Sequence, residues 1–157
     1  MSEVRRLVEQ MKLVFVGNES GEARFGPALL HLLKEINSKR ALFRVTPETH
    51  NIWELVLHLT AWKKYTAARL RDETATMNDQ LDWEKIERTD EAAWNEALQK
   101  LHDAQAELIS ASEKLSNDQL DTPVANGRAP RYLALHGIIQ HDIYHAGQIA
   151  YLKKLSD

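Results

Sequence analysis

The 157-residue sequence contains no cysteine, and it has only six glycines and four prolines. Without a thiol the chain can form no disulfide bond, no thiolate metal site and no cysteine nucleophile. Any thiol that takes part in its chemistry must therefore arrive with a ligand. The few prolines and glycines lie near or between long segments of helical periodicity, where they indicate helix ends.

The sequence also lacks a long apolar run and an excess of basic residues. The longest apolar run, Leu13 to Val16, is far shorter than the roughly 20 residues that span a bilayer. It is also too short for the core of a signal peptide, so we expect a cytoplasmic protein without a membrane partner. The net charge is -3, which supplies no positive field for collecting phosphates. We therefore expect no nucleic-acid partner.

Apolar residues recur at three- and four-residue steps along most of the chain, which predicts an all-α protein. The length fits one domain, residues 1–157, built from four principal helices with long connections. Of these connections, 72–88 is predicted to hold at most two helical turns and 116–129 to be a loop. The four principal helices are predicted over Ser2–Val16, Asn51–Leu70, Asp90–Leu115 and Arg131–Leu155, and a short extra helix is predicted in a connection over Pro27–Ile36.

The helix predicted over 131–155 carries two histidines in the middle of its apolar face. His141 and His145 are four residues apart, so their rings stand on one face within one turn. His58 lies at the edge of the apolar stripe of the 51–70 helix and can face the same interior. Three imidazoles can hold one metal ion and leave coordination positions open, as in catalytic zinc sites. The spacing alone fits equally well three core histidines that are hydrogen-bonded to neighbours.

Other catalytic motifs are absent from the sequence. It has no HExxH, no Glu-x-x-His pair for a di-iron site, no glycine-rich phosphate loop and no GxSxG elbow. Near the histidines, Glu54 is predicted to cap a helix and Asp142 to face solvent or a partner. Gln148 is predicted either to orient a ligand or to form an ordinary core hydrogen bond. No catalytic acid or base is identified.

Two stretches resemble the DinB/YfiT-like superfamily: the run from His50 to His58 with Trp62 after it, and the run from His136 to Ile149. Segments 25–30 and 120–124 are also similar, so the resemblance covers nearly the whole chain. It implies a four-helix bundle of up-down-down-up topology with a divalent metal, usually zinc or nickel. The implied ligands match His58, His141 and His145.

The resemblance implies two kinds of activity. Some relatives look like transferases that use a low-molecular-weight thiol such as bacillithiol, mycothiol or glutathione, and others look like metal-dependent hydrolases. We expect thiol transfer to a small electrophile, because three neutral ligands leave the ion its full charge and favour an anionic thiolate. The alternatives are hydrolysis of a small substrate, and a non-catalytic bundle in which the ion only links helices.

The resemblance also implies a homodimer. Trp53 and Leu57 point away from the apolar stripe of their predicted helix, so we expect these two residues to mark the contact between subunits.

Overall fold

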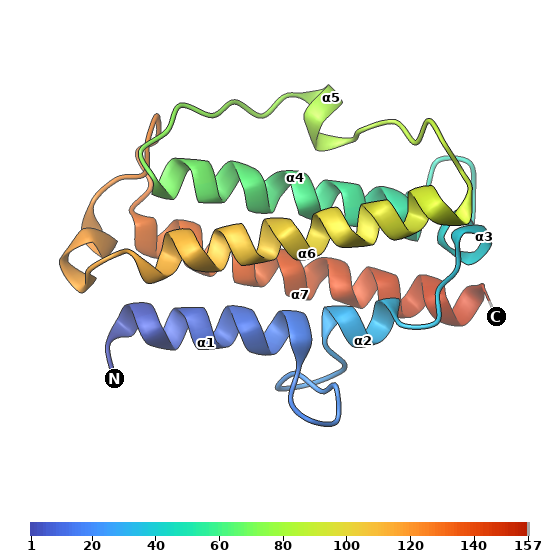
Figure 1. The fold of residues 1–157 in the computed structure, drawn as a ribbon, viewed down its shortest axis with the longest axis horizontal. Helices are drawn as coiled ribbons and strands as arrows, with labels where there is room; N and C mark the ends of the chain where they lie inside the picture. Colours follow the sequence, from blue (N-terminus) through green and yellow to red (C-terminus); the bar gives the residue numbers. More distant parts are fainter. Residues whose placement is uncertain (157) are drawn as a thin grey trace.

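The computed structural model describes residues 1–156, which form a bundle of helices (Figure 1). Within these residues there is no β-sheet, and no helix combines the length and hydropathy needed to cross a membrane. The prediction of an all-α fold is therefore confirmed. The helices are α1 (Glu3–Val16), α2 (Leu29–Leu33), α3 (Ser38–Ala41), α4 (Ile52–Leu70), α5 (Asp79–Asp82), α6 (Glu91–Glu113), the 3-10 helix η1 (Asn117–Asp121) and α7 (Arg131–Leu155).

The bundle has the expected up-down-down-up topology. In Figure 1, α1 and α2 follow each other along one edge and run in the same direction. Helices α4 and α6 both run in the opposite direction, and α7 returns. Because α4 and α6 are parallel neighbours, the chain between them must travel back along the bundle. Residues 71–90 make this crossover on the outer side of α4, and they carry the short helix α5.

Helix starts follow the capping residues in the sequence. The side chain of Asn51 accepts a hydrogen bond from the Glu54 amide (2.9 Å), and the Glu54 carboxylate accepts one from the Asn51 amide (3.1 Å). This reciprocal capping box fixes the start of α4. The end of α2 differs from the prediction, because the helix stops at Leu33 rather than at residue 36. Glu35 takes a left-handed conformation (φ 68°), which a helix cannot continue through.

The apolar core is divided into two clusters along the bundle. One includes Leu59 and Trp94, and the other includes Leu108 and Leu135. On α4, α6 and α7 the sequence between the two clusters contains buried polar side chains. They include Lys63, Gln105 and Asp142. A polar layer therefore crosses the middle of the bundle.

A buried ion pair lies in this layer. The ammonium of Lys63 donates hydrogen bonds to both carboxylate oxygens of Asp142, the first at 2.7 Å, and the two side chains are 0% and 3% exposed. The prediction that Asp142 faces solvent or a partner is therefore wrong. Helix α7 packs against α1, α2 and α4, so its buried face is wider than a single stripe. Burial lowers the pKa of Lys63 and raises the pKa of Asp142, while their mutual attraction opposes both shifts.

Trp53 is a core residue instead of a surface residue. Its side chain is 2% exposed and its ring centroid lies 5.2 Å from that of Trp94. Leu57 is half-buried and packs against the same cluster. The predicted contact surface through Trp53 and Leu57 is therefore wrong, because α6 packs against the side of α4 that was expected to be free. The homodimer itself stays a prediction without a located interface.

Replacing Lys63 with Met is expected to destabilise the fold by about 3–5 kcal/mol, because the substitution leaves Asp142 buried without its counter-ion. The double variant Lys63→Met with Asp142→Leu is expected to lose less stability than Lys63→Met alone, since no charge is then left unpaired. Urea unfolding of the three proteins measures this difference. Lys64→Met at the adjacent exposed position is the control and is expected to change stability by about 0.5 kcal/mol or less. A double variant less stable than the single one contradicts the expectation.

Candidate metal centre

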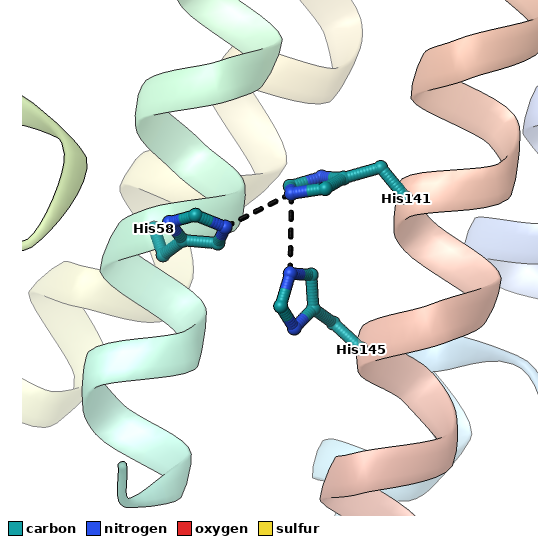
Figure 2. Close-up of side chains that lie close together, drawn as sticks. All are labelled: His58, His141 and His145. Atoms are coloured by element: carbon teal, nitrogen blue, oxygen red, sulfur yellow. Dashed lines mark hydrogen bonds between the residues drawn. The ribbon is translucent and has the colours of Figure 1, made fainter.

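Three histidines from two helices bring their side-chain nitrogens together beside the polar layer. Helix α4 supplies His58, and α7 supplies His141 and His145 (Figure 2). The Nε2 atom of His141 lies 2.9 Å from His58 Nε2 and 3.1 Å from His145 Nε2. One ligand atom from each ring falls within 4.8 Å of the other two. The structure thus brings together all three residues that the sequence predicted as ligands.

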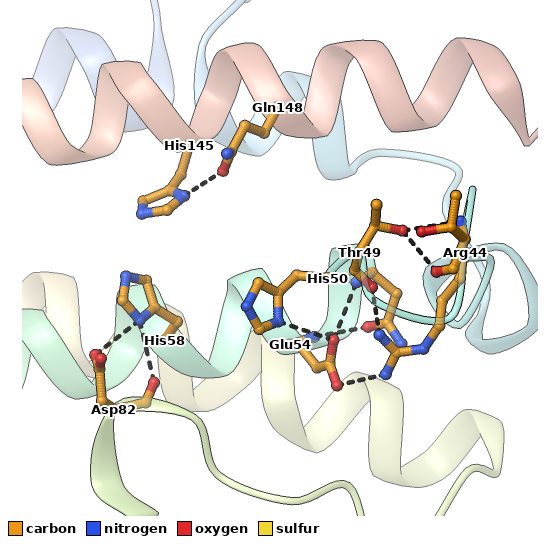
Figure 3. A network of polar contacts seen from close by, with 10 residues as sticks. Arg44, Thr49, His50, Glu54, His58, Asp82, His145 and Gln148 are labelled. Carbon is orange, nitrogen blue, oxygen red and sulfur yellow. Dashed lines mark hydrogen bonds and ion pairs between the residues drawn. The ribbon is translucent and has the colours of Figure 1, made fainter. Parts of the chain in front are cut away.

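Two of the rings have their outer nitrogens engaged by hydrogen-bond acceptors (Figure 3). Nδ1 of His58 lies 3.0 Å from a carboxylate oxygen of Asp82 and 3.1 Å from its backbone carbonyl. Nδ1 of His145 lies 2.6 Å from Oε1 of Gln148. Because these partners only accept, each Nδ1 carries the proton. In the neutral form of His58 and His145, which is the form that binds metal, Nε2 is then unprotonated and directs a lone pair toward His141.

His141 alone cannot satisfy both lone pairs. Its Nε2 can carry at most one proton and can donate it to only one neighbour. Its Nδ1 is buried and has no hydrogen-bond partner among the described residues. At least one inward nitrogen therefore remains without a donor, an arrangement that costs free energy unless a cation accepts the lone pairs. Nitrogens bound to one zinc ion at tetrahedral angles lie about 3.3 Å apart, close to the two short distances here. The three residues therefore fit a divalent metal.

The electrostatics of the site keep two of the rings neutral. Burial, followed by the neighbouring His145, His58 and Lys63, lowers the pKa of His141 to about 3. Burial also lowers the pKa of His145, although the hydrogen bond that its Nδ1 donates to Gln148 opposes this shift. Both imidazoles are uncharged at neutral pH, which is the form that binds metal.

The crossover connection holds His58 from outside the bundle. The ring of Trp83 stacks on that of His58 with centroids 4.2 Å apart, and it stacks on His50 with centroids 3.5 Å apart. The indole nitrogen of Trp62 donates to the carboxylate of Asp82 at 2.6 Å. Asp82 and Trp83 were not predicted from the sequence. Their segment has no helical periodicity. Its one local signal is Asn78, a helix-capping residue, which predicts the short helical turn around Asp82 and Trp83 but not where their side chains point.

The residues predicted to surround the ligands are placed as follows. Gln148 orients His145, which is one of its two predicted roles. The carboxylate of Glu54 caps α4 as predicted, and it also binds Arg44 and approaches Nδ1 of His50 at 3.3 Å (Figure 3). The Arg44 and His50 contacts and the Asn51 amide together hold the pKa of Glu54 low, against the opposing effect of burial. Glu54 is thus fully engaged at the rim of the site.

A cavity of about 360 Å³ adjoins the cluster, and both His58 and His141 form part of its wall. This volume lies within the range of small-molecule sites. No aspartate or glutamate lines it. The other residues that line the cavity are Trp62, Tyr65, Thr66, Arg69, Val124, Ala134, Gly137 and Ile138.

Comparison with known families agrees with this arrangement. Residues 24–149 match the sequence model of the DinB superfamily. The chain belongs to the DinB superfamily. The matched region contains all three histidines of the cluster, and this membership confirms the family that the sequence resembled. No curated protein matches the sequence.

We expect the purified protein to carry close to one divalent ion per chain. Replacing His141 and His145 together with alanine is expected to lower the metal content at least about tenfold, since only one imidazole then remains. Elemental analysis of the two proteins measures this change. His50→Ala is the matched control, because His50 lies beside the cluster but outside it, and the metal content of this variant should stay unchanged. Equal metal content in wild type and the double variant contradicts the assignment.

Asp82→Ala is expected to weaken metal binding by about 10–100-fold while all three imidazoles remain. The carboxylate is one of two acceptors for the proton on Nδ1 of His58, and without it only the backbone carbonyl of residue 82 holds the ring in its tautomer and orientation. Competition with a chromogenic chelator measures the dissociation constant. Asp79→Ala, on the exposed side of the same short helix, should bind metal as the wild type does. Identical affinity in the two variants shows that Asp82 does not position the ligand.

Proposed function

We propose that the protein is a divalent-metal-dependent transferase that joins a low-molecular-weight thiol to a small electrophile. The observation that carries this proposal is the cavity whose wall includes His58 and His141. The cluster is therefore accessible to a small molecule from one side. A purely structural ion needs no such space, because its coordination is closed by protein ligands.

The chemistry needs a nucleophile, and the cavity wall contains no serine or lysine, nor does the chain contain cysteine. A divalent ion held by three neutral imidazoles supplies Lewis acidity, which lowers the pKa of a thiol or a water molecule that binds to it. In the proposed reaction the sulfur forms a bond to an electrophilic carbon, the leaving group departs from that carbon, and the thiol proton passes to solvent. Zinc and nickel both suit imidazole ligands.

The chain's own residues support thiol transfer over hydrolysis. Hydrolysis normally uses a positioned base, and each carboxylate near the cluster is engaged elsewhere. Asp82 binds His58 and Trp62, Glu54 caps α4 and binds Arg44, and Asp142 pairs with Lys63. These contacts are direct hydrogen bonds or ion pairs. A thiol has a far lower pKa than water and does not depend on such a base.

The apolar part of the cavity wall limits the access of water. Trp62 and Ile138 cover the cavity beside the histidines, so a bound electrophile excludes water from this side of the cluster. Asp82 and Gln148 hold His58 and His145 in fixed tautomers throughout, which keeps their inward nitrogens free of protons.

The test is to incubate metal-loaded protein with glutathione and 1-chloro-2,4-dinitrobenzene, and separately with p-nitrophenyl esters. Thioether formation above the uncatalysed rate is expected, with at least about a tenfold loss in His58→Gln. His50→Ala should retain the activity and serves as the control.

Two results overturn the transferase proposal. Turnover of the esters that depends on His58, together with the absence of thiol transfer, assigns a hydrolase. If neither substrate class reacts, and no other thiol in a panel does, the ion is structural.

A further inference from the structure

Arg69 is the one residue with a permanent charge among those that line the cavity. It follows His58 by eleven residues on α4, which corresponds to about 16 Å along a helix. The cavity therefore extends along α4, with the histidine cluster toward one end and a guanidinium toward the other. The residues between them are mostly apolar or aromatic, including Trp62 and Ile138.

The guanidinium of Arg69 is held in a defined position. Its Nε donates to the backbone carbonyl of Ala125 at 2.9 Å, and its central carbon lies 5.0 Å from the ring centroid of Tyr65. Its Nη2 packs against Gly127, where an added Cβ would lie only 1.9 Å from this nitrogen. The loop after α6 thus leaves space for this side chain and fixes its direction.

The outer nitrogens of Arg69 are not used by the rest of the protein. Among residues 1–156 no carboxylate pairs with Arg69 and neither Nη atom has a hydrogen-bond partner. Two other arginines near the same end of the bundle are paired, Arg71 with Glu73 and Glu107, and Arg131 with Asp72. A half-buried guanidinium beside an apolar wall favours a counter-ion with two oxygens, which its two Nη groups can bind side by side.

We propose that the cavity takes an elongated small molecule that carries a single carboxylate, bound by Arg69, and an apolar body that contacts Trp62 and Ile138. At the Arg69 end of the cavity, one positive charge beside an apolar wall balances one negative charge, so a monocarboxylate fits this end better than a dianionic phosphate. This proposal rests on the proposed function in one respect, because the reacting end of the molecule lies toward the histidine cluster. Arg69 is then the residue that selects the substrate class.

The test compares three probes of similar shape: 4-phenylbutyrate, its neutral amide, and 3-phenylpropyl phosphate. Each is titrated by calorimetry into the zinc-loaded protein and into the metal-stripped protein. The carboxylate is expected to bind both forms at least about tenfold more tightly than the amide, the size of effect given by one charge-assisted pair. It is also expected to bind more tightly than the phosphate.

Three variants assign the effect to Arg69. Arg69→Met is expected to bind acid and amide equally, and Arg69→Lys to keep part of the preference, because the charge remains but the paired donors do not. Arg128→Met is the matched control, since Arg128 is exposed on the same loop and does not line the cavity, and it should keep the full preference. Thermal melting shows that each variant is folded.

Equal binding of acid and amide to the wild-type protein overturns the proposal without reference to any variant. The proposal is also overturned if Arg69→Met still prefers the acid over the amide, or if this preference appears only with zinc present. Tighter binding of the phosphate than of the carboxylate overturns it as well. If the protein holds no metal or transfers no thiol while the metal-stripped form still prefers the acid through Arg69, the carboxylate site stands and only the proposed reaction fails.

Discussion

Three imidazole nitrogens converge inside a helical bundle, and their need for protons or a cation constrains the residues around them. Two of the rings have their protons fixed on the outer nitrogen by Asp82 and Gln148, so their inner lone pairs face each other across His141. A bundle closed by apolar packing alone would gain stability by replacing these rings with leucine. The cluster, two of whose rings line a cavity, is instead consistent with a divalent-metal site.

The topology provides the support that these rings need. Parallel α4 and α6 require a long return connection, and this connection carries Asp82 and Trp83 to the outer side of His58. An antiparallel pair joined by a short turn would leave that side of the ring without a partner. The three histidines that were predicted as ligands lie within the region that matches the DinB superfamily, and the structure brings them together.

Most of the helices and the pairing of His141 with His145 could be predicted because their signals are local. The capping box at Asn51 and Glu54 and the four-residue spacing of His141 and His145 each lie within a few residues of sequence. Asp82 and Trp83 could not be found in this way, because a connection without periodicity gives no direction to its side chains. Asp142 was placed wrongly because a helix with several neighbours buries a wider arc than one stripe indicates.

The same wider burial explains why Trp53 is not at the surface, as was expected. It lies off the main apolar stripe of α4 but packs against Trp94 of the parallel helix α6. A helical wheel drawn for one helix assumes one buried side, whereas α4 is in contact with both α6 and α7. Predictions of exposed surface on this helix therefore depended on the arrangement of the whole bundle, which the sequence pattern alone does not contain.

The three histidine side chains and the residue that orients one of them come from different parts of the chain. Helices α4 and α7 supply the three histidine side chains, whereas the orientation of His58 is set by the connection of residues 71–90 outside the bundle. Asp82 belongs to neither core cluster, so a substitution at this position changes the support of His58 while the core residues stay the same. The fold thus offers a scaffold in which the surroundings of His58 can diverge through a connection, while the helices that carry the three histidines stay the same.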